Sequence, residues 1–252
     1  MSLASVKEKL ISFVFQDTCC FCGQAINGQD RAMAQDVASI ACNTCFEQVV
    51  GNPLDRCYHC SAQTTFENPF GSRCRICRNW PDHFERAFAI GHYCDAVKST
   101  VLEIKRDSND IKAYQLGKLL GLICAKFDMP DTVDGVVPVP SHWRRRFGRR
   151  GFHVSDVIAE GFCQFTGLTK IPALKCQRFT KKQAKLGPAG RIKNVRGAFA
   201  VNSRTSFKDR QILLLDDVMT SGATVSECAK ILTKAGASAV FVAVAARATG
   251  IS

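Results

Sequence analysis

Eight cysteines form four pairs in which two residues separate the sulfur-bearing positions, and this spacing suits a metal ion. A gap of two residues lets both thiolates of a tight turn face one ion, and two such turns complete a tetrahedral zinc site with four cysteine ligands. Gly23 follows one pair, where a left-handed residue commonly closes the turn. The pairs are Cys19/Cys22, Cys42/Cys45, Cys57/Cys60 and Cys74/Cys77. We predict one or two structural Zn²⁺ ions, with sequential or crossed pairing both open.

Other uses of these cysteines have weaker support in the sequence. Disulfides would require an oxidising compartment, a redox C-x-x-C would require a surrounding βαβ pattern, and Fe–S clusters also use four cysteines. Few large apolar residues lie between the pairs, so a metal must supply the folding energy there. His59 is not expected to be a ligand. We expect buried or incidental thiols at the remaining cysteines, Cys20, Cys94, Cys124, Cys163, Cys176 and Cys228.

A second chemical motif is the run Ile212–Thr224, in which an apolar strand leads into two acids and then into a small, hydroxyl-rich loop. Free N–H groups at the start of the following helix, with nearby hydroxyls, can cradle a phosphate. Asp216 and Asp217 are suited to ribose hydroxyls, directly or through Mg²⁺, and Gly222 would let a ligand approach the backbone. The predicted phosphate-binding residues are Thr220, Ser221, Gly222, Ala223 and Thr224.

Positive charge is concentrated in a third region. The segment 137–208 holds 16 Lys and Arg against two acids, whereas the whole chain has a net charge of +12. Such a surface attracts polyanions through counterion release, and aromatic side chains can stack on unpaired bases. An ordinary solvated face is the alternative. We predict that single-stranded nucleic acid contacts Trp143, Arg144, Arg145, Arg146, Arg149, Arg150, Lys181, Lys182 and Arg191.

Strands that alternate with helices must position these residues. The pattern predicts a strand or hairpin at 84–93, strands at 135–139, 171–174, 211–215 and 239–246, and helices at 95–105, 111–127, 154–165 and 223–234, the last closed by Gly236. This order is typical of an α/β domain with a mainly parallel sheet. We predict a cysteine-rich zinc-binding module over residues 1–82, with an N-terminal helix, and an α/β domain over residues 83–252.

Composition limits the class of protein. Of 252 residues, 46% are hydrophobic and 22% charged, which excludes wholesale disorder. No apolar run reaches the roughly 18 residues that span a bilayer, and no signal peptide is recognised. We therefore expect a cytoplasmic protein, which could work at the inner face of the membrane.

Taken together, these motifs resemble the ComF family, also called ComFC or GntX-like, over nearly the whole chain. The run Ile212–Thr224 is similar to the phosphoribosyl pyrophosphate (PRPP) signature of type I phosphoribosyltransferases. The basic turn 138–152 is similar to the family's P-V-P…R-R-G-F-N-Q segment, and Lys105 matches a family lysine. A further string matches at Arg178, Thr180, Gln183, Leu186, Arg191, Asn194, Gly197 and Phe199. His153, Val154 and Arg106 depart from the family pattern.

The resemblance implies a zinc finger followed by a phosphoribosyltransferase-like domain that binds PRPP with Mg²⁺. It also implies a role in natural transformation, in which single-stranded DNA is handled as it enters the cytoplasm. The partners would be DNA, PRPP or a related ligand, and the uptake machinery: a membrane DNA channel and a ComF-type helicase. The alternatives are an active phosphoribosyltransferase of unknown acceptor, with Asp217 as its general base, and a zinc-stabilised adaptor.

Overall fold

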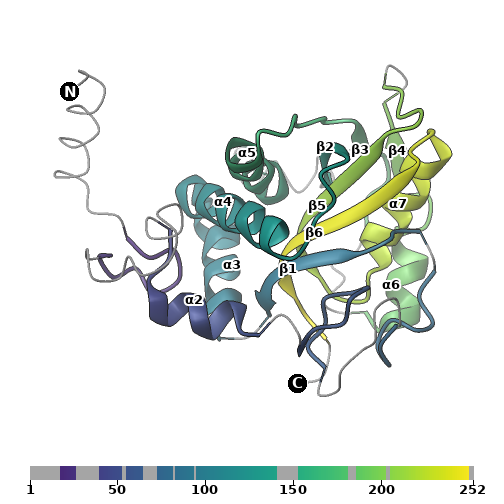
Figure 1. The fold of residues 1–252 in the computed structure, drawn as a ribbon. Helices are drawn as coiled ribbons and strands as arrows, with labels where there is room; N and C mark the ends of the chain where they lie inside the picture. Colours follow the sequence, from purple (N-terminus) through teal and green to yellow (C-terminus); the bar gives the residue numbers. More distant parts are fainter. Residues whose placement is uncertain are drawn as a thin grey trace, which may run out of the picture.

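A four-stranded parallel sheet forms the centre of the molecule (Figure 1). The computed structural model describes residues 18–26, 40–52, 55–64, 73–81, 83–93, 95–140, 153–180, 186–202 and 205–249. The strand order is β1-β6-β5-β2, with parallel pairing throughout. The strands are β1 (Ala87–His92), β2 (Val133–Pro138), β5 (Gln211–Met219) and β6 (Ala239–Arg247). The predicted α/β fold with a mainly parallel sheet is confirmed.

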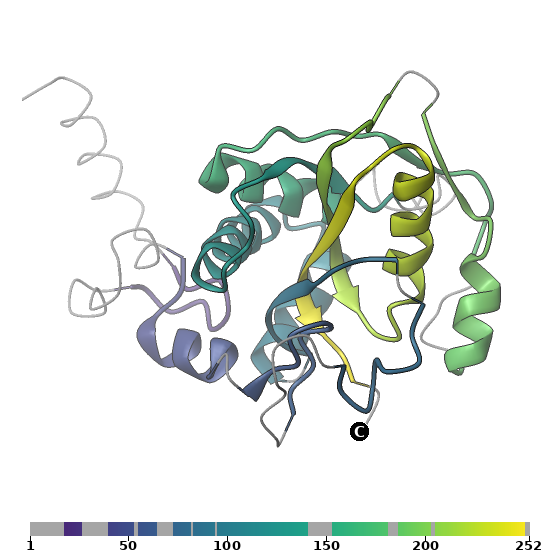
Figure 2. The same ribbon diagram turned by 45° about the vertical axis from the view of Figure 1, so that its right-hand side comes forward.

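Helices cover both faces of the sheet because neighbouring residues of a strand point to opposite sides. Leu213 and Leu215 of β5 belong to one hydrophobic cluster, whereas Ile212 and Leu214 belong to the other. The helices α3, α4 and α5 pack on the first cluster, and α7 packs on the second (Figures 1 and 2). Their bounds are α3 (Asp95–Asp107), α4 (Asp110–Lys126), α5 (Val154–Thr166) and α7 (Ala223–Lys234).

A short antiparallel hairpin lies beside this sheet. It pairs β3 (Leu174–Cys176) with β4 (Phe199–Val201), and α6 (Pro188–Val195) lies between the two strands in the chain. The predicted strand at 171–174 is wrong in its bounds. Ile171 instead donates its N–H to Val136 O, so this stretch lies along β2 and regular pairing begins only at Leu174.

The cysteine-rich segment packs directly on the α/β core. Buried residues on either side of the second cysteine pair, Ile40 and Phe46 among them, share the hydrophobic cluster of α3 and α4. Helix α2 (Asn43–Val50) begins immediately after Cys42 and was not predicted. These contacts cross the boundary proposed between residues 82 and 83, which stays a prediction. None of the helices in the described ranges combines the length and apolar character needed to cross a membrane.

Candidate metal centres and phosphate-binding loop

The eight paired cysteines form two separate groups of four. The first consists of Cys19, Cys22, Cys42 and Cys45, and the second of Cys57, Cys60, Cys74 and Cys77, with all sulfur atoms of a group within 4.8 Å of one another. Pairing is therefore sequential, and two ions can be held. We call these groups the first and second cysteine clusters. His59 is in neither group, and its Nδ1 lies 3.0 Å from Glu85 O.

Sulfur separations fit a tetrahedral ion. With a Zn–S bond of about 2.3 Å, neighbouring sulfurs of a regular tetrahedron lie about 3.8 Å apart. In the second cluster the Sγ–Sγ distances are 3.8 Å for Cys57–Cys77, 3.7 Å for Cys60–Cys74 and 3.8 Å for Cys74–Cys77. In the first cluster Cys22 and Cys42 are 3.9 Å apart. Disulfide bonds would be about 2.05 Å long, so these groups fit metal sites.

The first pair of each cluster lies on the same type of turn. Gly23 N donates to Cys19 O over 2.9 Å, and Ser61 N donates to Cys57 O over 2.9 Å. Gly23 and Ser61 both have positive φ, 73° and 54°, as expected for Gly23. The sequence did not reveal this repeat, because Ser61 stands where glycine would be expected.

The thiols of the second cluster strongly affect one another's ionisation. Hydrogen bonds from Cys60 and Cys77 lower the pKa of the Cys57 thiol, whereas the hydrogen bonds to Cys57 and Cys60 raise the pKa of Cys77. The hydrogen bond to Cys57 contributes most to a pKa of about 12 for Cys60. Four buried thiols cannot all ionise without a positive charge between them. A divalent ion would supply that charge.

The predicted phosphate-binding loop joins β5 to α7, at the carboxyl end of a central strand. In open parallel sheets this edge is where ligands bind. Helix α7 begins after Gly222, whose φ is 70° and which has no side chain to cap the first turn. Its first N–H groups have no partner within the helix. The Ser221 hydroxyl is buried and has no hydrogen-bond partner in the described part of the chain. The Ser221 hydroxyl is therefore available to an anion at the start of α7.

Asp216 lies within β5, not beyond it. The strand continues to Met219, and Asp216 pairs in register with Val244 of β6. Its Oδ1 accepts from Ser155 Oγ over 3.0 Å and from the Asp217 N–H over 2.8 Å. Burial, with the charge of Asp217, raises the pKa of Asp216 to about 7. The strand predicted at 211–215 therefore ends too early, because β6 continues beside both acids.

Asp217 pairs with a lysine from a distant helix. Lys105 of α3 lies 2.7 Å from Asp217 Oδ2. Burial opposes the lysine charge, but the contact with Asp217 outweighs this effect and raises the pKa of Lys105. The motif resemblance marked Lys105 without giving it a role. The structure brings Lys105 and Ser155 to the acid pair, and no local sequence pattern predicted either contact.

Gly222 makes its close contact with Trp80. A Cβ at Gly222 would lie 2.5 Å from Cζ3 of the Trp80 ring. The positive φ and this contact together explain the glycine. The indole fills the space on the Cβ side of Gly222, and ligand approach to the backbone at Gly222 stays a prediction. Trp80 follows the second cysteine cluster in the chain. The cysteine-rich segment therefore contacts the phosphate-binding loop through this side chain.

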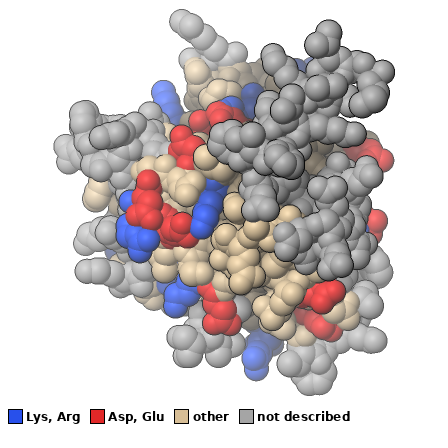
Figure 3. Space-filling view, turned by 90° about the vertical axis from the view of Figure 1, so that its left-hand side faces the viewer, with Lys and Arg blue, Asp and Glu red and all other residues tan. Residues whose placement is uncertain are grey.

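Most of the predicted nucleic-acid contacts lie outside the described residues: Trp143, Arg144, Arg145, Arg146, Arg149, Arg150, Lys181 and Lys182. Arg191 is described, and its Nε donates to Leu186 O over 2.8 Å. On the face in Figure 3, acidic and basic side chains are interspersed. The described residues on that face form no continuous basic surface.

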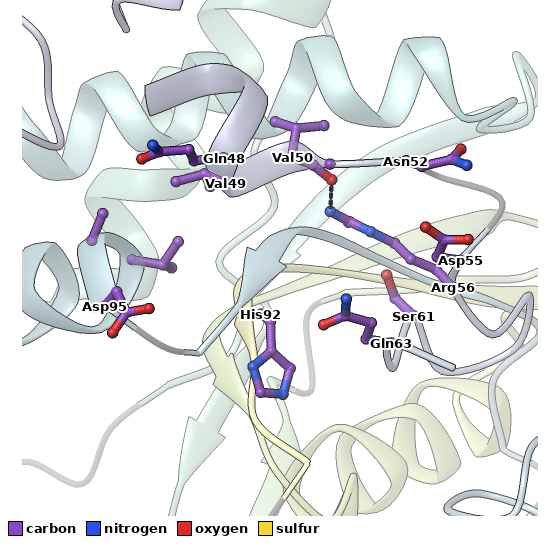
Figure 4. Close-up of a pocket in the computed structure, with 13 residues that line it drawn as sticks. Gln48, Val49, Val50, Asn52, Asp55, Arg56, Ser61, Gln63, His92 and Asp95 are labelled. Carbon is purple, nitrogen blue, oxygen red and sulfur yellow. Dashed lines mark hydrogen bonds between the residues drawn. The ribbon is translucent and has the colours of Figure 1, made fainter. Parts of the chain in front are cut away.

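A pocket of about 450 Å³ opens where β1 meets the cysteine-rich segment (Figure 4). It is lined by polar side chains, including Gln63, His92 and Asp95, together with Val49 and Val97. Arg56 lies along one side and donates to Val50 O, Ala89 O and Ile90 O. Burial lowers the pKa of Arg56. This arginine thus fixes the cysteine-rich segment to β1.

Comparison with known proteins supports the resemblance. No family model matches the chain. It is 25% identical over 212 residues to Competence protein F of Haemophilus influenzae, covering 82% of this chain and 90% of that protein. It is 29% identical over 180 residues to DNA utilization protein YhgH of Escherichia coli K12, covering 67% and 75%. The similarity to competence proteins predicted from the motifs is confirmed.

Among solved structures, the chain is similar to glutamine PRPP amidotransferase from B. subtilis complexed with ADP and GMP. The TM-score is 0.36 with 22% identity, over 52% of this chain and 25% of that one. It is also similar to the protein TT1426 from Thermus thermophilus, with a TM-score of 0.32 and 15% identity over 52% and 72%.

Proposed function

We propose that this protein acts in DNA uptake in the cytoplasm, where it handles incoming single-stranded DNA and binds a phosphoribose ligand such as PRPP. The observation that carries the proposal is the β5–α7 loop. It combines an acid pair, a helix N-terminus that begins at a glycine, and a buried hydroxyl that has no partner among the described residues. Similarity to a competence protein and to a DNA utilization protein supports the DNA role.

Each group in the loop has a role in this proposal. The first N–H groups of α7 and the Ser221 hydroxyl would hold the 5′-phosphate. Carboxylate oxygens of Asp216 and Asp217 would hold the ribose hydroxyls, or Mg²⁺ that neutralises a pyrophosphate. Lys105 would hold the Asp217 carboxylate in position through their ion pair of 2.7 Å. The two cysteine clusters would hold Zn²⁺.

An active phosphoribosyltransferase is the second candidate, and the state of Asp216 favours it. A carboxyl whose pKa is about 7 can take up or release a proton near neutral pH, as a general base must. On this view, an acceptor would attack C1 of the ribose while pyrophosphate departs. The family resemblance instead suggested Asp217 as the base, but Asp217 is already paired with Lys105 at 2.7 Å.

Salt dependence tests the DNA role. If the basic segment neutralises phosphates, log affinity for a single-stranded oligonucleotide should fall with log salt by about 0.7 per phosphate. Replacing Arg144, Arg145 and Arg146 with Ala should reduce the slope by about 2. Trp143→Ala should lower affinity with the slope unchanged, because stacking contributes about 1–3 kcal/mol per base. Fluorescence anisotropy across a salt series measures both.

A matched control removes three exposed lysines outside the basic segment: Lys98, Lys126 and Lys234. Each is solvent-exposed in the structure, and their replacement with Ala should leave the slope unchanged. Duplex of the same length should bind more weakly, since its bases are not free to stack. If duplex binds as tightly as single strand and Trp143 has no effect, single-strand handling is wrong.

A further inference from the structure

Arg247 connects the second cysteine cluster to the phosphate-binding loop. It ends β6, between the ends of β1 and β5, and its side chain is fully buried. Its Nε donates to Cys60 O over 2.9 Å. Its Nη1 donates to Met219 O over 3.1 Å and to Thr220 O over 2.6 Å. One guanidinium therefore holds a residue of the cluster and the first residues of the loop together.

The charge of Arg247 requires a buried counter-charge. A buried cation without a partner is strongly destabilising. Among the described residues, no carboxylate lies within ion-pairing distance of Arg247, and its Nη2 lies 3.9 Å from Cys60 Sγ. A divalent ion with four thiolates has a net charge of −2. The metal-loaded second cluster can therefore compensate Arg247, whereas four neutral thiols cannot.

Trp80 makes the second connection. It packs against the second cluster and against the hydrophobic core beneath α7. The indole also lies 5.1 Å from the Arg247 guanidinium and fills the space beside Gly222. Arg73, next to Cys74 in the chain, donates to Trp80 O over 2.7 Å. Trp80 is therefore held by the cysteine-rich segment while it supports the residue from which α7 begins.

We propose that Arg247 and Trp80 are positioning residues that make the order of the 219–224 loop depend on metal at the second cysteine cluster. The affinity of the loop for a ribose phosphate then depends on the same metal, a consequence that rests on the proposed function. With metal bound, the net negative cluster compensates Arg247, which holds Met219 O and Thr220 O in place. Without metal, Arg247 loses its counter-charge and Trp80 loses its support.

The test compares Arg247→Met with Arg56→Met, because Arg56 is partly buried and also donates to backbone carbonyls of the cysteine-rich segment and β1. The acceptors of Arg56 are Val50 O, Ala89 O and Ile90 O, all outside the loop. Calorimetry with PRPP and Mg²⁺ should show at least a tenfold affinity loss for Arg247→Met and less than twofold for Arg56→Met. Both variants should retain metal, as elemental analysis would show. Trp80→Ala should lower affinity, and Trp80→Phe should recover part of it.

Hydrogen exchange separates this proposal from the proposed function. Amides 219–224 should lose protection in Arg247→Met and in metal-depleted wild type, while Arg56→Met retains it. If wild type does not bind PRPP but these amides still respond, the function is wrong and the positioning role stands. If Arg247→Met keeps both affinity and protection while wild type binds PRPP, the positioning role is overturned. Equal losses in Arg56→Met would also overturn it, since they would indicate general destabilisation.

Discussion

The two cysteine clusters contain the same ligands but lie in different surroundings. In the first, Cys22 is exposed and Cys42 is half-buried, and the residues around it join the hydrophobic layer of α3 and α4. In the second, all four cysteines are buried, and Cys60 O accepts from Arg247. The first therefore fixes a chain segment to a helical layer, whereas the second adjoins the phosphate-binding loop. The same C-x-x-C spacing within the pairs does not imply the same role, because the role depends on what surrounds each cluster.

Removing one pair from each cluster should show the largest difference. Cys57→Ser with Cys60→Ser should lose one metal ion and about 100-fold or more in PRPP affinity, because an uncompensated buried charge costs about 3 kcal/mol or more. Cys19→Ser with Cys22→Ser removes the equivalent turn of the first cluster. It should also lose one ion, but PRPP affinity should change by less than about threefold. Elemental analysis and calorimetry measure these effects.

If the two double variants lose PRPP affinity equally, both clusters stabilise the fold to the same extent. The loss of PRPP affinity would then reflect lower overall stability rather than the distance of a cluster from the phosphate-binding loop. Thermal denaturation of both variants distinguishes these cases, since metal binding contributes folding free energy at both clusters.

Metal release should separate the clusters by rate. A chromogenic chelator should remove one ion at least about tenfold faster than the other, because Cys22 is exposed whereas the second cluster is fully buried. PRPP binding should survive loss of the fast ion and disappear with the slow one. The variant Cys57→Ser with Cys60→Ser should show only the fast phase, and Cys19→Ser with Cys22→Ser only the slow phase. A single phase in wild type would contradict this difference.

Local patterns predicted the candidate metal ligands and the main elements, because spacing and periodicity are local properties. The C-x-x-C spacing identified all eight cysteines, and the helix predicted at 223–234 matches α7 (Ala223–Lys234). Sequential pairing could not be predicted, since it depends on how segments outside the turns bring the pairs together. The strand end was misplaced because two acids suggested a loop, although pairing with β6 keeps Asp216 in the strand.

The residues that connect regions were missed for a related reason. Arg247 is the only charged residue of the apolar strand Ala239–Arg247 and is fully buried. A charged residue at the end of an otherwise apolar strand does indicate a buried polar contact, because a buried charge needs partners. Its partners, Cys60 O and Thr220 O, are 187 and 27 residues away in the chain. No local pattern indicates contacts at that distance, and the same holds for Trp80 beside Gly222.

A more gradual effect is the pH dependence of the phosphate-binding loop, which should not depend on the first cluster. The pKa of Asp216 is raised from 3.8 to about 7, so the folded state holds a proton that the unfolded state has already released. The contribution of Asp216 to stability should therefore be greatest below pH 3.8, fall between pH 3.8 and 7, and level off above. Binding of PRPP with Mg²⁺ requires the ionised carboxylate, so affinity should rise with pH up to about 7 by at most about tenfold per unit.

The variant Asp216→Asn tests the contribution of this proton, because its side chain does not titrate. The variant should be more stable than wild type at about pH 8 and should bind more weakly there. Any pH dependence of binding that it retains belongs to the phosphates of the ligand, whose second pKa is about 6. Cys19→Ser with Cys22→Ser should keep the wild-type profile, because that cluster does not adjoin the loop. Calorimetry from about pH 5 to about pH 8 decides the matter: if wild type and Asp216→Asn give the same profile, Asp216 does not titrate at this site.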